Sequence, residues 1–312
     1  MHTLDTESNF LGLDASRSSL EGSKIAIVSA PYERTVSYGH GTAGGPQAIL
    51  AASHFVEFWD EEFQRDIGKD IGIAALAPID FTDATDEAAL SLIEDQVRRL
   101  LGLNKFVVTL GGEHSISAAP VRAYLEKYPE ITVLQIDAHS DLRESYEGNP
   151  LSHASVMARI CESVSPGRVV QVGIRAQCQE EFERIRKEGI HTFFSWKIRQ
   201  GLYGQSWMER VLDALGEQVY ITFDIDGLDP SIMPSTGTPE PGGLLWDETI
   251  RLLKLIGKHR HIAGFDLVEL APVAGTPGPD FLAAKLVSKI LNAAFANCQS
   301  GTDAGAGSEY TY

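Results

Sequence analysis

The chain has 312 residues, of which 43% are hydrophobic and 22% are charged, as in ordinary globular proteins. Its formal net charge of −17 opposes binding to nucleic acid and to anionic membranes. No apolar run approaches the roughly eighteen residues that a membrane span requires, and the N-terminus lacks a basic segment followed by an apolar core. We therefore expect no signal peptide, no membrane partner and a cytoplasmic location.

Short apolar runs alternate with amphipathic segments along the chain. The expected strands are bounded by Gly or Asp and are nearly all apolar, which is typical of strands buried on both faces of a parallel sheet; they are residues 24–29, 71–75, 106–110, 131–137, 169–174, 219–224 and 262–268. The expected helices are residues 87–101, 117–127, 180–187, 207–215, 247–258 and 279–296. This order predicts the α/β class, as a single three-layer α/β/α sandwich around a mostly parallel sheet.

No linker or change of composition divides the sequence, so we expect a single domain over residues 1–312. Its ordered core should cover about residues 22–297. Residues 299–312 are rich in Gly, Ser and acids, and we expect them, like residues 1–21, to be flexible.

Acids and histidines follow three of the expected strands. The motifs are GGEHS at 111–115, DAHSD at 137–141 and DID at 224–226. The carboxyl ends of parallel strands meet at one edge of a sheet, and alternate positions of an extended segment project to one side. We therefore expect one cluster of side chains, made of His114, Asp137, His139, Asp141, Asp224 and Asp226.

Such a cluster predicts a metal site. Burying four carboxylates together without cations would be prohibitive, because like charges and desolvation both oppose their ionisation. Two divalent cations relieve both costs. Carboxylates and imidazoles without cysteine favour Mn²⁺ over a structural zinc site, although Zn, Fe, Co and Ni stay open. Each motif alone is more often a solvated loop; the three together, each at a strand end, favour the metal site.

Several longer motifs resemble those of the ureohydrolases, the arginase–agmatinase family. They are GGEHS, DAHSDLR, FDIDGLDP and FDLVE, with SYGHGT and GGP near the start, and the resemblance extends from about residue 24 to residue 297. DAHSDLR followed by YEG, LSH and GIR is especially similar to bacterial agmatinases. The resemblance implies an arginase/deacetylase-like fold with an eight-stranded sheet, and trimers or hexamers.

The same resemblance implies two Mn²⁺ ions per subunit. His114, Asp137, Asp141 and Asp224 resemble the ligands of one ion, and His139, Asp137, Asp224 and Asp226 those of the other. The implied reaction is hydrolysis of a small cationic guanidino substrate to urea and a primary amine, with agmatine cut to putrescine, a step of polyamine biosynthesis, as the leading candidate.

Three further residues receive catalytic roles. Asp141 can orient the attacking hydroxide by a hydrogen bond. His153 is suited to carry a proton to the departing amine, because histidine is the side-chain type suited to proton transfer near neutral pH. Glu269 can pair with the guanidinium by two parallel hydrogen bonds, and Asp266 can hold a metal ligand in place.

The substrate is less certain than the chemistry. Arg143 and Cys178 stand where arginases have Asn and Asp, which argues against arginine. Glu144 can attract the amine of agmatine, whereas Arg143 can attract a carboxylate such as that of guanidinobutyrate. Guanidinobutyrase and guanidinopropionase therefore remain alternatives. Arginase, formiminoglutamase and a one-metal zinc deacetylase, or a relative that binds without catalysis, have less support.

Overall fold

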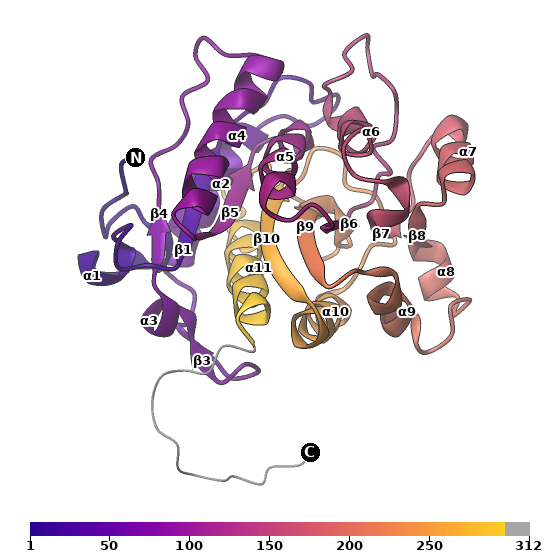
Figure 1. The fold of residues 1–312 in the computed structure, drawn as a ribbon. Helices are drawn as coiled ribbons and strands as arrows, with labels where there is room; N and C mark the ends of the chain where they lie inside the picture. The colour runs from indigo at the N-terminus through magenta and orange to yellow at the C-terminus, as the bar shows by residue number, and fades with distance from the viewer. Residues whose placement is uncertain (297–312) are drawn as a thin grey trace, which may run out of the picture.

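The computed structural model describes residues 1–296 and contains a central sheet of eight parallel strands in the order β4-β1-β5-β10-β9-β6-β7-β8 (Figure 1). The strands are β1 (Ile25–Ala30), β4 (Ile73–Ala75), β5 (Phe106–Gly111), β6 (Thr132–Ile136), β7 (Val169–Ile174), β8 (His191–Phe194), β9 (Gln218–Asp224) and β10 (His261–Val268). The predicted eight-stranded parallel sheet is thus confirmed. A separate antiparallel pair is formed by β2 (Trp59–Asp60) and β3 (Arg65–Asp66).

Helices cover both faces of the sheet because its strands are apolar on both sides. One face packs against α2 (Gly45–Ser53), α3 (Ile67–Ile71), α9 (Trp207–Ala214), α10 (Trp246–His259) and α11 (Gly278–Ala294). The other face packs against α4 (Glu87–Gly102), α5 (Ala118–Lys127), α6 (Val156–Ile160) and α7 (Gln179–Glu188). The short helices α1 (Ala15–Ser18) and α8 (Ser195–Arg199) lie beside the edge strands β4 and β8 (Figure 1). These layers confirm the predicted three-layer sandwich.

Successive residues of a strand point to opposite helical layers, and this alternation positions the site. In β6, Leu134 and Ile136 join the core beneath α10 and α11, whereas Val133 joins the core beneath α4 and α5. Gln135 and Asp137 therefore lie on the same side as Val133, facing the layer of α4, α5 and α6. The carboxylate and imidazole side chains at the ends of β6 and β9 lie on this same side of the sheet.

The expectation of a flexible segment at residues 1–21 is corrected by the structure. Phe10 is fully buried in the core, the backbone N–H of Leu11 donates to Ser53 of α2, and Thr3 forms a bridge with Leu76 beside β4. This segment therefore covers one edge of the sheet. The expected flexible residues 299–312 lie outside the described residues. Within residues 1–296, no helix is long and apolar enough to cross a membrane.

Candidate metal centre and its cavity

The site lies at the carboxyl ends of four adjacent strands in the middle of the sheet, β5, β10, β9 and β6. After β5 the chain turns at Gly112, where a Cβ atom would lie 2.0 Å from the carbonyl oxygen of Tyr32. Only glycine fits there without a backbone shift. The turn places His114 at the start of the 3₁₀ helix 114–117, buried and directed at the neighbouring strand ends.

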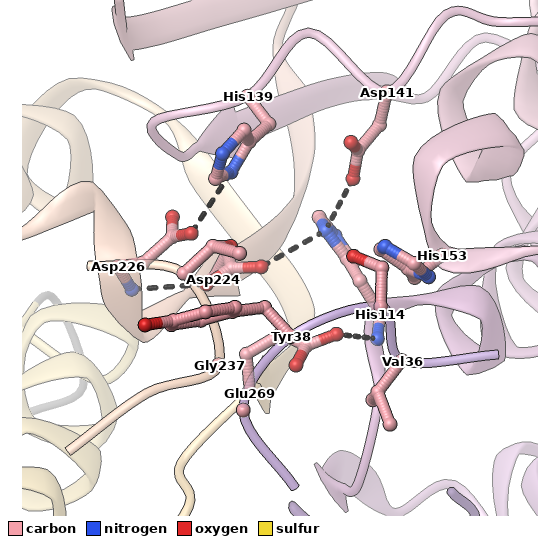
Figure 2. Close-up of a pocket in the computed structure, with 13 residues that line it drawn as sticks. Val36, Tyr38, His114, His139, Asp141, His153, Asp224, Asp226, Gly237 and Glu269 are labelled. Carbon is pink, nitrogen blue, oxygen red and sulfur yellow. Dashed lines mark hydrogen bonds and ion pairs between the residues drawn. The ribbon is translucent and has the colours of Figure 1, made fainter. Parts of the chain in front are cut away.

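The predicted metal ligands converge in two groups. Nδ1 of His114 lies 3.0 Å from Asp141 and 3.3 Å from Asp224 (Figure 2). It also lies 3.1 Å from Asp137. Nδ1 of His139 lies 2.9 Å from Asp226 and 3.7 Å from Asp137. Asp137 belongs to both groups, so the arrangement can hold two neighbouring ions that share this carboxylate.

The chemistry of these groups fits divalent cations. Nδ1 of His114 is fully buried, forms no hydrogen bond among the described residues and faces three carboxylate oxygens. Burial raises the pKa of Asp224 well above its ordinary value, and the charges of Asp226 and Asp137 raise it further. Divalent cations displace such protons and neutralise the crowded acids. Oxygen and imidazole ligands without sulfur are those that Mn²⁺ accepts.

Hydrogen bonds from β9 and β10 fix the orientation of His114. The hydroxyl of Thr222 donates to Asp266 over 2.8 Å, so its oxygen accepts from Nε2–H of His114 over 2.9 Å. This tautomer leaves Nδ1 with a free electron pair toward the carboxylates. Asp266 is held in turn by the hydroxyls of Tyr220 and Ser117. Asp266 thus lies behind a ligand, where the sequence placed it, and Thr222 is a residue that sequence reasoning missed.

A second buried chain of hydrogen bonds holds Asp137. Gln135 donates to Asp137 over 2.7 Å, Gln171 donates to Gln135 over 2.6 Å, and Thr192 donates to Gln171 over 2.8 Å. The three side chains behind Asp137 stand in register on β6, β7 and β8. Thr222 continues the same row on β9. One polar row across the sheet therefore supports ligands of both metal groups.

Two of the predicted catalytic residues have left-handed backbone conformations, with φ of 52° at Asp141 and 65° at Glu269. Such conformations cost a non-glycine residue about 1–3 kcal/mol and persist only when the surroundings enforce them. Asp141 is held because its carbonyl accepts hydrogen bonds from Met157 and Ala158. The backbone N–H of Glu269 donates to Gly112. This strain is typical of a functional site.

Glu269 faces the cavity that the metal groups line (Figure 2). Its Oε1 accepts the backbone N–H of His114 over 2.6 Å, and its Oε2 accepts no hydrogen bond from residues 1–296. Burial raises the pKa of Glu269 well above its ordinary value, and the charge of Glu113 raises it further. A cationic planar group beside Oε2 would offset this penalty by pairing with the carboxylate.

His153 lines the same cavity and is oriented from a loop distant in sequence. The hydroxyl of Thr35 donates to buried Glu113 over 2.8 Å, so its oxygen accepts from Nδ1–H of His153 over 3.1 Å. Nε2 of His153 is then free to accept a proton. Glu113 is fixed by backbone N–H donors of residues 34 and 35. Sequence reasoning assigned no role to Glu113 and missed Thr35.

The two predicted specificity residues differ in location. Arg143 lines an outer cavity of about 260 Å³, which shares His139, Asp141 and His153 with the metal cavity. Glu144 lines neither cavity. Its carboxylate instead pairs with Arg159 and Arg184 on the surface, at 3.1 Å and 2.7 Å. Glu144, expected to contact the substrate, therefore lies outside both cavities in this structure. Other cavity residues, which the sequence did not single out for binding, are Ser37, Thr238, Glu181 and Glu240.

Known proteins are similar to this chain in sequence and in structure. Residues 23–292 match the model of the arginase family. An N(1)-aminopropylagmatine ureohydrolase from Synechocystis sp. is 38% identical over 273 residues, which cover 86% of this chain and 88% of the relative. An agmatinase from Bacillus cereus is 37% identical over 261 residues, covering 83% of this chain and 87% of the relative. The crystal structure of the agmatine ureohydrolase of Thermoplasma volcanium matches with a TM-score of 0.81 at 29% identity, covering 95% of each chain.

Proposed function

Because the chain belongs to the arginase family and is a ureohydrolase, a hydrolase acting on C–N bonds of amidines, we propose that it cleaves agmatine to urea and putrescine with two Mn²⁺ ions bound. The observation that carries this proposal is the pair of metal-capable groups sharing Asp137, with the free oxygen of Glu269 at the same cavity. A guanidinium and a water can meet there. The agmatinases among the relatives support agmatine as the guanidine.

The bound ions would supply Lewis-acid chemistry, which lowers the pKa of a water and neutralises the surrounding carboxylates. The chain's own residues bind the guanidinium, orient the attacking oxygen and deliver the proton. Glu269 pairs with the guanidinium through Oε2 and orients its carbon. Asp141 accepts a hydrogen bond from the attacking oxygen. When the C–N bond breaks, the departing nitrogen needs a proton, and His153 delivers it from Nε2 while Thr35 holds the ring. The products are urea and a primary amine.

N(1)-aminopropylagmatine is the second candidate substrate, because relatives with that activity match this chain as well as the agmatinases do. The outer cavity of about 260 Å³ provides room beyond the metal groups for a longer amine tail. Both candidates share the guanidinium and the cationic tail, and they differ in length.

A substrate panel tests the proposal. Purified protein loaded with Mn²⁺ is assayed for urea release from agmatine, N(1)-aminopropylagmatine, arginine, guanidinobutyrate and guanidinopropionate, with Asp137→Ala as the control. We expect the highest kcat/KM with agmatine and loss of urea release in the variant. A preference for N(1)-aminopropylagmatine would favour the second candidate. No urea from any guanidine would contradict the proposed function.

Three further properties belong to the same proposal. We propose a single ureohydrolase domain, a cytoplasmic location and a homo-oligomer, a trimer or hexamer. The net charge of −17 supports a small cationic substrate and the absence of nucleic-acid partners. Light scattering of the purified protein tests the oligomer, and a monomer at micromolar concentration would contradict it.

A further inference from the structure

The outer cavity adjoins the metal cavity. The two share Ser37, His139, Asp141, His153 and Thr238 in their walls. A substrate whose guanidinium lies beside Glu269 can therefore extend its tail past His153 into the outer cavity. The charged groups that line this outer cavity decide which tail is accepted.

Among the described residues that line the outer cavity, Arg143 is the only arginine or lysine, and it is paired with an acid. Nε of Arg143 lies 3.8 Å from the carboxylate of Glu181, and its guanidinium stacks on Tyr146 at 5.4 Å from the ring centroid. Glu181 in turn accepts the backbone N–H groups of Leu142 and Cys178 over 2.9 Å and 2.7 Å. This buried acid is fixed in position, and Arg143 is held against it. The Arg143 guanidinium and the Glu181 carboxylate therefore contact each other rather than a substrate carboxylate or amine.

Glu240 is different, because its carboxylate forms no hydrogen bond and no ion pair among the described residues. It lines the outer cavity and is partly buried. Its backbone carbonyl, in contrast, is firmly held: Arg175 donates to it over 2.7 Å and also donates to the carbonyl of Asp226 over 2.6 Å. One guanidinium therefore ties Glu240 to the loop that carries a metal-ligand candidate. The backbone of Glu240 is thus held in place, and its carboxylate is left unpaired at the cavity.

We propose that Glu240 binds the distal ammonium group of the substrate and thereby selects guanidines with a cationic tail over guanidines with a carboxylate tail. This inference rests on the proposed function, because it assumes that the guanidinium binds at Glu269. With Arg143 paired to Glu181, the unpaired charge of the outer cavity is negative. An ammonium gains a charge-assisted hydrogen bond there, whereas a carboxylate meets a like charge. Glu240 takes the role that the sequence assigned to Glu144.

The test compares Glu240→Gln with wild type on agmatine, on butylguanidine, which lacks the amine, and on guanidinobutyrate. Glutamine keeps the size and removes the charge. The KM for agmatine should rise about tenfold, the effect of one charge-assisted hydrogen bond at a partly exposed site, with kcat changed less than twofold. The KM for butylguanidine should show no comparable rise, and the preference for agmatine over guanidinobutyrate should fall.

Glu144→Gln provides the matched comparison, because it removes the same charge from a neighbouring surface acid that lines neither cavity. It should leave the KM for agmatine within twofold of wild type. An unchanged KM for agmatine in Glu240→Gln, or an equal rise of the KM for butylguanidine, would overturn the inference about Glu240. The proposed function would still stand in that case if wild type released urea from agmatine. Absence of urea from every guanidine with wild type would overturn both.

Discussion

Replacing Thr222 with valine removes one hydroxyl from behind the metal groups while keeping the shape of the side chain. The hydroxyl accepts from His114 over 2.9 Å and donates to Asp266 over 2.8 Å. In the variant, Nε2–H of His114 is buried without an acceptor, and the ring loses the contact that fixes its tautomer. Asp266 keeps its bonds from Tyr220 and Ser117, so the main loss falls on His114.

The magnitude follows from these contacts. Removing the hydrogen-bond partner of a metal ligand lowers metal affinity by about 10- to 100-fold, or about 1.4–2.8 kcal/mol at one of the two sites. The unsatisfied donor should also destabilise the metal-free protein by about 1–3 kcal/mol. Competition with a fluorescent chelator measures Mn²⁺ affinity without reference to activity, and urea denaturation of the metal-free proteins measures stability.

Thr109→Val is the control for this experiment. Thr109 is buried in the same face of the sheet, in register with Asp266, and it makes no hydrogen bond to a metal-ligand candidate. We expect its Mn²⁺ affinity to stay within twofold of wild type. Equal affinities in Thr222→Val and Thr109→Val would refute the reasoning that the Thr222 hydroxyl orients His114.

Three other predictions concern proton transfer, metal removal and stability. Thr35→Val should lower kcat for urea release at least tenfold and alter the pH profile of kcat, because His153 loses the acceptor for Nδ1–H. The metal content should stay unchanged. An unaltered pH profile would argue against the role of Thr35 in orienting His153. Chelation should lower the melting temperature and excess Mn²⁺ should restore it, since an ion present at 100 times its Kd stabilises by about 2.7 kcal/mol per site; an identical melting temperature would indicate no binding. Lys289→Met should cost about 3–5 kcal/mol of unfolding free energy, because buried Asp60 loses the ammonium group that lies 2.9 Å from it. Burial alone would lower the pKa of Lys289, but the hydrogen bonds that it donates to Glu62 and Asp60 outweigh burial and raise this pKa. Wild type should therefore keep the stabilisation below pH 10.5 and lose it above. Thermal unfolding at pH 8 and above pH 11 should show that the difference in stability between wild type and variant shrinks, and a constant difference would count against the ion pair.

The sheet was predictable where a strand is mostly apolar, as expected of strands covered on both faces. The expected bounds of β7 agree with the structure, and those of β5 and β9 differ from it by one residue at one end. β8 escaped prediction because it is an edge strand in which only Phe193 and Phe194 are buried. α2 also escaped prediction, because it begins with Gly45-Pro46, a pair that is typical of turns. Proline is nevertheless tolerated in the first turn of a helix.

The metal groups were predictable because each ligand directly follows a strand, so that local sequence and sheet topology determine its position. The side chains that orient these candidate ligands could not be predicted in the same way. Gln171 reaches Asp137 only through Gln135, and Thr35 reaches His153 across 118 residues of sequence. No spacing along the chain encodes such contacts. The same holds for Glu144, whose two arginine partners become visible only in the folded chain.

The proposed hydrolysis of a guanidine requires that each of the two groups sharing Asp137 holds an ion. The most direct measurement is a titration of the metal-free protein with Mn²⁺, in which bound metal per chain and urea release from agmatine are followed together. We predict that activity reaches its plateau at two equivalents of bound Mn²⁺ per chain. Saturation at one equivalent, or two bound equivalents without urea, would contradict the account.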